Sequence, residues 1–224
     1  MIMNLFSVFD PSTSMNYSLN WISLIYLMMF FPLMYWFIPS RWNMIYIYLI
    51  SVLINEFTML LNKKLNLMNL VILLSIFILI MLTNLLGMFP YIFTSSSHLI
   101  YSLTLSLVLW LSFMLYGWIK NMNHMFIHLV PQGTPVILMP FMVLIESISN
   151  IIRPGTLAVR LSANMIAGHL LMTLISSTGS SLMVLLLVLM LFVQSLLVVL
   201  ELSVAVIQAY VFTVLSTLYS AESN

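Results

Sequence analysis

The chain has 224 residues, of which 63% are hydrophobic and only 5% are charged, and its formal net charge is +1. Because soluble domains carry about 25% charged residues, this composition excludes a soluble protein and predicts an all-α integral membrane protein, with residues 1–224 as a single membrane domain. The near-neutral charge offers no basic surface for nucleic acid, and the absence of cysteine excludes disulfides and thiolate metal sites.

About 20 apolar residues cross a bilayer as a helix, and the first such stretch covers residues 20–38. Trp21, Tyr35 and Trp36 lie near its ends, where aromatic side chains favour the membrane interface. The residues before it lack the basic segment of a secretory signal and the Arg-rich pattern of a transit peptide. We therefore expect either synthesis in the compartment where the protein resides or earlier removal of a leader.

A different pattern covers residues 41–64. Polar side chains recur at a helical spacing that puts one polar stripe along a helix, at Ser51, Asn55, Thr58 and Asn62. This pattern favours an amphipathic helix that lies in the membrane interface, with a further membrane span as the alternative. Basic residues close both ends and place the helix on the positive-inside face of the membrane: Arg41, Lys63 and Lys64.

Two clear spans follow at residues 67–93 and 99–119, and the short link between them predicts an antiparallel hairpin. The polar segment after the second span carries His124 and His128 at the i, i+4 spacing of some metal sites. No third ligand is near them in the sequence. We therefore interpret both as loop residues and expect neither a metal site nor another cofactor.

The last third of the chain predicts two unusually long helices, at residues 135–176 and 182–220. Pro140 and Pro154 interrupt the first, whereas residues 182–219 contain no glycine and no proline. These residues as one helix would be roughly 57 Å long, against a hydrocarbon core of about 30 Å. We expect these two helices to form a strongly tilted hairpin, within a fold of about five membrane-embedded helices and one interfacial helix.

Ionisable residues within these two helices are the main functional signal, and they are Glu146, Arg153, Arg160, His169 and Glu201. A charge at the centre of a bilayer costs roughly 2.5–3.5 kcal/mol on insertion scales. Such residues usually face a partner or a water-filled cavity and mark a path for ions or protons.

Structural explanations stay open for the first two of these residues. Arg153 precedes Pro154 at a predicted helix interruption, where its long side chain could extend to the interface or bond free carbonyl groups. Glu146 lies seven residues before Arg153, near the same helix face, and could simply neutralise it.

Structural explanations also stay open for Glu201 and His169. Gln208 follows Glu201 by seven residues on the same face, so a static hydrogen bond between helices could account for both. His169 falls on the helix face opposite Arg160 and could be a hydrogen-bonded core residue. Histidine is nevertheless the side chain that changes charge most readily near pH 7.

Arg160 is the hardest of these residues to explain by packing. Arginine stays protonated where lysine or histidine would lose a proton on desolvation. A permanent cation attracts a carboxylate whose charge changes, and it repels a passing proton. The residues alone therefore predict a proton or cation path with a fixed positive barrier.

Two segments carry a family resemblance: residues 128–171, with the motif PGTLAVRLSANMIAGH, and residues 200–219, with ELSVAVIQAYVF. They resemble subunit a of the F-type ATP synthases, and the animal mitochondrial form looks nearest. NLFSVFDPS near the start is similar to the arthropod versions. The resemblance covers essentially the whole chain.

The resemblance implies a stator subunit, without catalysis of its own, that packs against a rotating ring of c subunits in the mitochondrial inner membrane. Other membrane subunits, the peripheral stalk and the lipid bilayer would be further partners. Protons would reach the ring by one aqueous half-channel and leave by another, and Arg160 would separate the two.

Further site residues follow from the same resemblance. Glu201 and His169 match residues of the half-channel that faces the intermembrane space. Glu146 and Glu222 match acidic residues of the half-channel that faces the matrix. The polar neighbours of the arginine and of the proton path would be Asn164 and Gln208.

Two other classes of protein stay open. A stand-alone ion-coupled secondary transporter often shows inverted repeats with paired broken helices, whereas these buried charges all lie in the C-terminal half of this chain. A membrane subunit without a transport role would give no reason for Arg160 and its ionisable neighbours.

Overall fold

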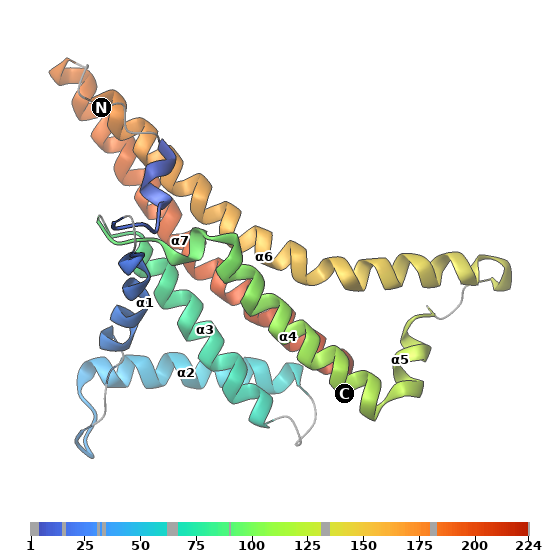
Figure 1. The fold of residues 1–224 in the computed structure, drawn as a ribbon. Helices are drawn as coiled ribbons and strands as arrows, with labels where there is room; N and C mark the ends of the chain where they lie inside the picture. Colours follow the sequence, from blue (N-terminus) through green and yellow to red (C-terminus); the bar gives the residue numbers. More distant parts are fainter. Residues whose placement is uncertain are drawn as a thin grey trace.

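The computed structural model describes residues 5–14, 17–30, 32, 35–61, 67–89, 91–130, 135–179 and 183–223. These residues form helices and no strand, which confirms the predicted all-α class. The long helices, labelled in Figure 1, are α2 (Arg41–Leu60), α3 (Leu67–Gly87), α4 (Leu99–Lys120), α6 (Met139–Thr178) and α7 (Val184–Ser223). All five are long and apolar enough to cross a membrane.

The described residues of the predicted span 20–38 do not form a single helix. Its place is taken by short helical pieces, η2 (Leu19–Ile22), α1 (Ser23–Tyr26) and η3 (Leu27–Phe30). Together they are only roughly 20 Å long, too short for a hydrocarbon core of about 30 Å. Pro32 disfavours one continuous helix over this range, because proline has no N–H donor and clashes with the preceding turn of a helix.

Helix α2 begins after Ser40, whose hydroxyl oxygen accepts a hydrogen bond from the Asn43 N–H at 3.4 Å. Its buried residues Leu53 and Phe57 belong to a core shared with α3. Figure 1 shows α2 running across the end of the bundle rather than along it. That orientation suits an interfacial helix, and the interfacial position stays a prediction. Two of the basic residues predicted to close its end, Lys63 and Lys64, lie outside the described residues.

Helices α3 and α4 take the predicted hairpin positions, but α3 ends at Gly87, before the predicted Phe93. The linker contains the short helix η5 (Ser95–Ser97), whose three serines are all buried. Tyr91 in this linker has φ 69°, a left-handed conformation that is uncommon for residues other than glycine. The linker therefore forms a fixed turn that packs against α3, α4 and α6.

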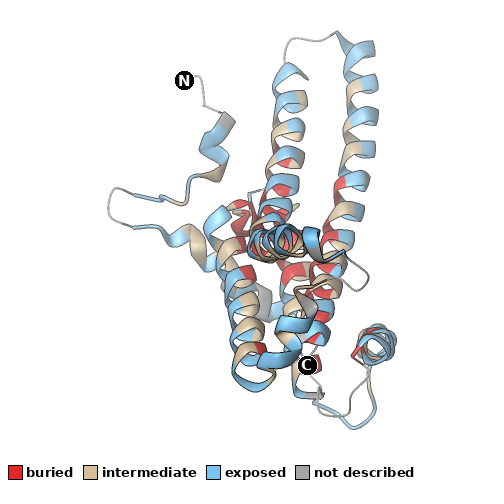
Figure 2. Ribbon diagram, turned by 90° about the vertical axis from the view of Figure 1, so that its right-hand side faces the viewer, coloured by how far each residue is buried: buried red, intermediate tan, exposed pale blue. Residues whose placement is uncertain are grey.

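Helices α6 and α7 have 40 residues each, so each is roughly 60 Å long. Pro154 lies inside α6 without ending it. In Figure 1, one half of α6 runs beside α7 and the other half turns away from it, as expected of a helix that loses a backbone hydrogen bond at proline. Figure 2 shows the closed end of the hairpin projecting from the bundle with mostly exposed residues.

The buried apolar core lies where α2, α3, the middle of α6 and the second half of α7 meet. Its largest fully buried side chains include Phe57, Leu73, Ile80, Leu161 and Phe212. The first half of α7, in contrast, is almost entirely exposed and apolar. Exposed apolar surface of this extent is suited to lipid or to partner subunits.

Candidate functional site

Apart from Arg160, the ionisable residues that the sequence singled out on α6 and α7 form two separate groups. The first, which we call the Arg153 cluster, contains Glu146, Arg153, Tyr219 and Glu222. The second is the His169–Glu201 pair. Along α7, Glu201 and Glu222 are roughly 31 Å apart by helical rise.

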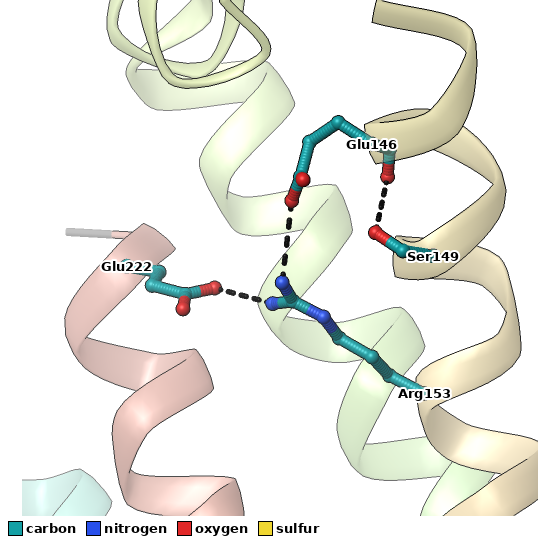
Figure 3. A network of polar contacts seen from close by, with 4 residues as sticks. All are labelled: Glu146, Ser149, Arg153 and Glu222. Atoms are coloured by element: carbon teal, nitrogen blue, oxygen red, sulfur yellow. Dashed lines mark hydrogen bonds and ion pairs between the residues drawn. The ribbon is translucent and has the colours of Figure 1, made fainter. Parts of the chain in front are cut away.

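Figure 3 shows how Arg153 joins both carboxylates of the Arg153 cluster. Its Nη1 lies 2.8 Å from Glu222 Oε2, and its Nη2 lies 3.3 Å from Glu146 Oε1. The guanidinium carbon also lies 5.4 Å from the centre of the Tyr219 ring, within the range of cation–π attraction. Glu146 thus does neutralise Arg153, as the sequence allowed, but Glu222 is a second partner and leaves the cluster with a net negative charge.

A pocket of about 430 Å³ opens beside the Arg153 cluster. Aromatic and methionine side chains from α4 and α5 (Met122–His128) form its apolar wall, and Glu146, Asn150, Arg153 and Glu222 form its polar wall. The side chain of Glu222 is 54% exposed and that of Glu146 is 34% exposed. These carboxylates are therefore accessible from the pocket.

Arg160 lies on an exposed face of α6, one turn before Asn164, which is exposed as well. It forms no hydrogen bond or ion pair with a residue in the described part of the chain. An arginine in the hydrocarbon region is stable only with a partner or water. A partner or water from outside these residues would therefore satisfy its charge.

Asn164 connects this exposed face to α7. Its Nδ2 donates a hydrogen bond of 3.1 Å to Oε1 of the buried Gln208. Gln208 thus makes an interhelical hydrogen bond, but its partner is not Glu201. The structure therefore favours separate roles for Glu201 and Gln208.

Glu201 and His169 face each other across the two helices. His169 Nε2 lies 3.5 Å from Glu201 Oε1, and both side chains are buried. Neither oxygen of Glu201 has a hydrogen-bond partner within the described residues, and the same is true of His169 Nε2. This pair is thus a buried, titratable site whose hydrogen bonds are incomplete.

Gly168 and Phe9 shape the surroundings of the pair. A Cβ atom on Gly168 would lie 2.7 Å from Glu201 Oε1, so only glycine lets the carboxylate come this close to α6. On another side, the Phe9 ring meets the His169 ring edge to face, with 6.4 Å between their centres. Phe9 belongs to η1 (Leu5–Phe9), a short helix that packs against α6.

Glu56 of α2 is a further carboxylate, not among the site residues predicted from the sequence. The Tyr210 hydroxyl on α7 donates a hydrogen bond to Glu56 Oε2 at 3.2 Å. The available signal was an acidic residue next to Asn55 of the polar stripe, inside a mostly apolar helix. In the described part of the chain no three histidine, aspartate or glutamate side chains are placed to hold a metal ion.

Comparison with known proteins identifies a single family. The sequence model of the ATP synthase A chain matches residues 2–221. The chain is 58% identical over 224 residues to ATP synthase subunit a of Drosophila melanogaster, and this alignment covers 100% of both chains. It is 57% identical to ATP synthase subunit a of Anopheles gambiae over 226 residues, with 100% of both chains covered. It is 56% identical to the Locusta migratoria protein of the same name over 223 residues, 99% of each chain.

Proposed function

The chain belongs to the ATP synthase A chain family, and we propose that it is the proton-translocating stator subunit of the F-type ATP synthase membrane sector, located in the mitochondrial inner membrane. Two offset half-channels would lead protons to and from the carboxylates of a c-ring. Other membrane and peripheral-stalk subunits would hold the chain in place. Family membership over almost the whole chain supports this role over that of a stand-alone transporter.

The observation that carries the proposal is the placement of Arg160. It is an exposed cation on α6 without a partner in the described chain, and ionisable groups lie before and after it on the same helix. A carboxylate on a passing rotor subunit would supply the missing counter-charge. Because arginine keeps its proton, the same group would repel a proton that tried to cross directly between the half-channels.

The His169–Glu201 pair supplies the half-channel that faces the intermembrane space. Glu201 can take up a proton at either oxygen, because neither is bonded within the described residues. Gln208 and Asn164 continue a polar line from α7 to the exposed face of α6. Protons would follow this line toward the rotor carboxylate.

The Arg153 cluster supplies the half-channel that faces the matrix. Its pocket is large enough for water, and its carboxylates are exposed to it. Arg153 contacts both carboxylates through its guanidinium group. A proton released from the ring would reach a water-accessible outlet lined by these two carboxyl groups.

The energy at stake shows why a barrier is needed. One elementary charge that crosses 100 mV releases roughly 2.3 kcal/mol. A proton that passed straight from one half-channel to the other would release this energy without turning the rotor. Arg160 therefore has to block the direct route at every moment of the cycle.

The test is substitution of Arg160 in the intact complex, with ATP-driven proton pumping measured in inverted membrane vesicles. Arg160→Ala should abolish pumping while the chain stays inserted, because the change removes charge from an exposed face and leaves the core intact. Arg160→Lys should be nearly as damaging, since lysine lacks the planar fork and can deprotonate when desolvated. Normal coupled pumping in Arg160→Ala would overturn the proposal.

Thr156→Ala is the matched control. Thr156 is exposed one turn before Arg160, and its hydroxyl donates only to the Arg153 carbonyl oxygen of its own helix. Its removal changes the same face of α6 without changing charge. Pumping should stay close to that of the unaltered complex.

A further inference from the structure

The pocket beside the Arg153 cluster has the size and the mixed walls of a small-molecule site. Its volume of about 430 Å³ lies within the range of about 300–1,000 Å³ that is typical of ligand pockets. One wall consists of aromatic and thioether side chains, namely Trp110, Phe113, Met114, Trp118 and Met125. Such a wall receives the apolar body of a ligand, so the polar wall determines which charge the ligand carries.

The polar wall contains two carboxyl groups for one guanidinium group (Figure 3). Arg153 contacts Oε2 of Glu222 and Oε1 of Glu146, and it leaves the other oxygen of each carboxyl group for a ligand. A ligand with one positive charge therefore complements this wall, whereas an anion would meet two carboxyl groups. A polyamine would bring more charges than the wall can match, and it has no apolar body for the opposite wall.

The aromatic rings around these carboxyl groups suit a cation as well. The Arg153 guanidinium carbon already lies 5.4 Å from the centre of the Tyr219 ring. The Trp118 ring is held by Phe126 of α5, with an angle of 89° between the rings and 5.1 Å between their centres. Aromatic faces beside negative charge are the arrangement that recognises quaternary ammonium groups.

We propose that this pocket binds an amphipathic organic cation, in which a single quaternary ammonium group is attached to an aromatic body. The ammonium group lies beside the carboxyl groups of Glu146 and Glu222, and the aromatic body packs on the wall formed by α4 and α5. The bound cation closes the outlet toward the matrix, a consequence that rests on the proposed function.

Binding to the detergent-solubilised intact complex tests the site without a proton gradient. The probe is 2-(2-naphthyl)ethyltrimethylammonium, and its neutral match carries a tert-butyl group in place of the trimethylammonium group. The cation should bind at one saturable site per complex and about tenfold more tightly than the neutral match, equivalent to about 1.4 kcal/mol. Equal affinities, or no saturable binding because another subunit fills the pocket, would overturn the inference.

Substitutions in the two walls show where the cation binds. Glu146→Gln and Trp118→Leu should each weaken binding of the cation about tenfold. Glu146→Gln should leave the affinity for the neutral match unchanged, which a general disturbance of the fold would not do. The matched controls are Glu56→Gln, on α2, and Tyr116→Leu, an exposed aromatic residue of α4 outside the pocket wall. Both controls should change the affinity by less than about twofold, the scatter expected for neutral substitutions.

Arg153→Gln tests the sign of the charge that the pocket prefers. Removal of the guanidinium group leaves both carboxyl groups to the ligand. The cation should therefore bind about threefold more tightly, as expected for the loss of a partly exposed charge. A pocket for an anionic ligand would respond in the opposite direction, so weaker binding of the cation in Arg153→Gln would contradict the inference.

Proton flux in vesicles tests whether the bound cation closes the outlet. The probe has a permanent charge and no proton to exchange, so it crosses membranes poorly and does not dissipate the gradient. Added to inverted vesicles, whose outer surface is the matrix face, it should lower flux over the concentration range in which it binds. Added outside vesicles of the opposite orientation, it should have no effect. Saturable binding that leaves flux unchanged would overturn closure of the outlet.

The outcomes separate this inference from the proposed function. The Arg160→Ala complex should still bind the cation, because Arg160 is not part of the pocket wall. If Arg160→Ala abolishes pumping but the cation binds no better than its neutral match, the proposed function stands and the inference is wrong. If Arg160→Ala pumps normally, the proposed function and the closure of an outlet are wrong, while the binding measurement still decides which ligand the pocket takes.

Discussion

The two ionisable groups of the hairpin differ in how exposed their side chains are and in how many partners those side chains have. In the Arg153 cluster, one guanidinium contacts two carboxylates at 2.8 and 3.3 Å beside an open pocket. In the His169–Glu201 pair, one contact of 3.5 Å joins two buried side chains, and neither His169 Nε2 nor either Glu201 oxygen has a hydrogen-bond partner in the described chain. The first group is satisfied and accessible, whereas the second is enclosed and incomplete.

This difference predicts how each group responds to change. Solvent can replace a lost partner in an accessible cluster, so a substitution there costs little. A buried pair has no such substitute, and a change of one atom alters its charge or its geometry. The His169–Glu201 pair should therefore be far more sensitive than the Arg153 cluster.

Between the two groups, the largest expected effect comes from Glu201→Gln. The amide keeps the volume and most of the hydrogen bonding of the carboxyl group but has no proton to exchange. Removal of a group that transfers protons typically costs at least about 100-fold in rate, so we expect proton flux through the complex to fall by that factor. Flux is measured in vesicles at a fixed proton gradient.

Ser203→Ala is the control for this variant, because Ser203 is an exposed residue of the same helix with its hydroxyl bonded to the Leu200 carbonyl oxygen. Its flux should be unchanged. Full flux in Glu201→Gln would show that Glu201 is a structural residue. The comparison between the two groups would then fail.

A smaller effect is expected from Gly168→Ala, which tests the geometry of the pair without removing a titratable group. The new Cβ would lie 2.7 Å from Glu201 Oε1 and 2.9 Å from Cδ, so the carboxyl group must move within a buried site. Alanine favours a helix over glycine by about 1 kcal/mol, so the subunit should still assemble. We expect flux to fall about tenfold, equivalent to about 1.4 kcal/mol.

Gly155→Ala offers the same gain in helix propensity at a position where an added Cβ meets nothing within 4 Å. Flux in that variant should match the unaltered complex, with equal or higher thermal stability. If Gly168→Ala and Gly155→Ala gave the same flux, the close approach of Glu201 to α6 would not affect proton transfer.

The long helices could be predicted because their signal is local. Residues 182–219 contain no glycine or proline, and the structure forms one helix there. The first predicted span was wrong for a local reason as well. The prediction gave more weight to the hydrophobicity of residues 20–38 than to Pro32. In the structure, the short helix η3 ends at Phe30.

Spacing along the sequence could predict contacts within one helix but not contacts between helices. Spacing along α6 placed Glu146 and Arg153 near one face, and the structure pairs them. The partner 69 residues away, Glu222, could not be found by spacing because periodicity describes one helix at a time. The same limit applies to His169 beside Glu201 and to Tyr210 beside Glu56.

The smallest loss of flux is expected from substitutions in the Arg153 cluster. Arg153 is 27% exposed and its partner Glu222 is 54% exposed, so solvent weakens their attraction. Exposed ion pairs contribute about 0.2–1 kcal/mol, which limits the loss of flux in Arg153→Gln to about fivefold. The effect should shrink further at high salt, because ions screen exposed charges over about 8 Å at physiological strength. Flux should therefore be measured at low and high salt in Arg153→Gln, Glu222→Gln and the double variant. The fold-loss of flux in the double variant should not exceed the product of the fold-losses in the two single variants. A loss of flux in Arg153→Gln as large as in Glu201→Gln, and unchanged by salt, would contradict this comparison. The accessible cluster would then be as sensitive to substitution as the buried pair, and burial would not determine that sensitivity.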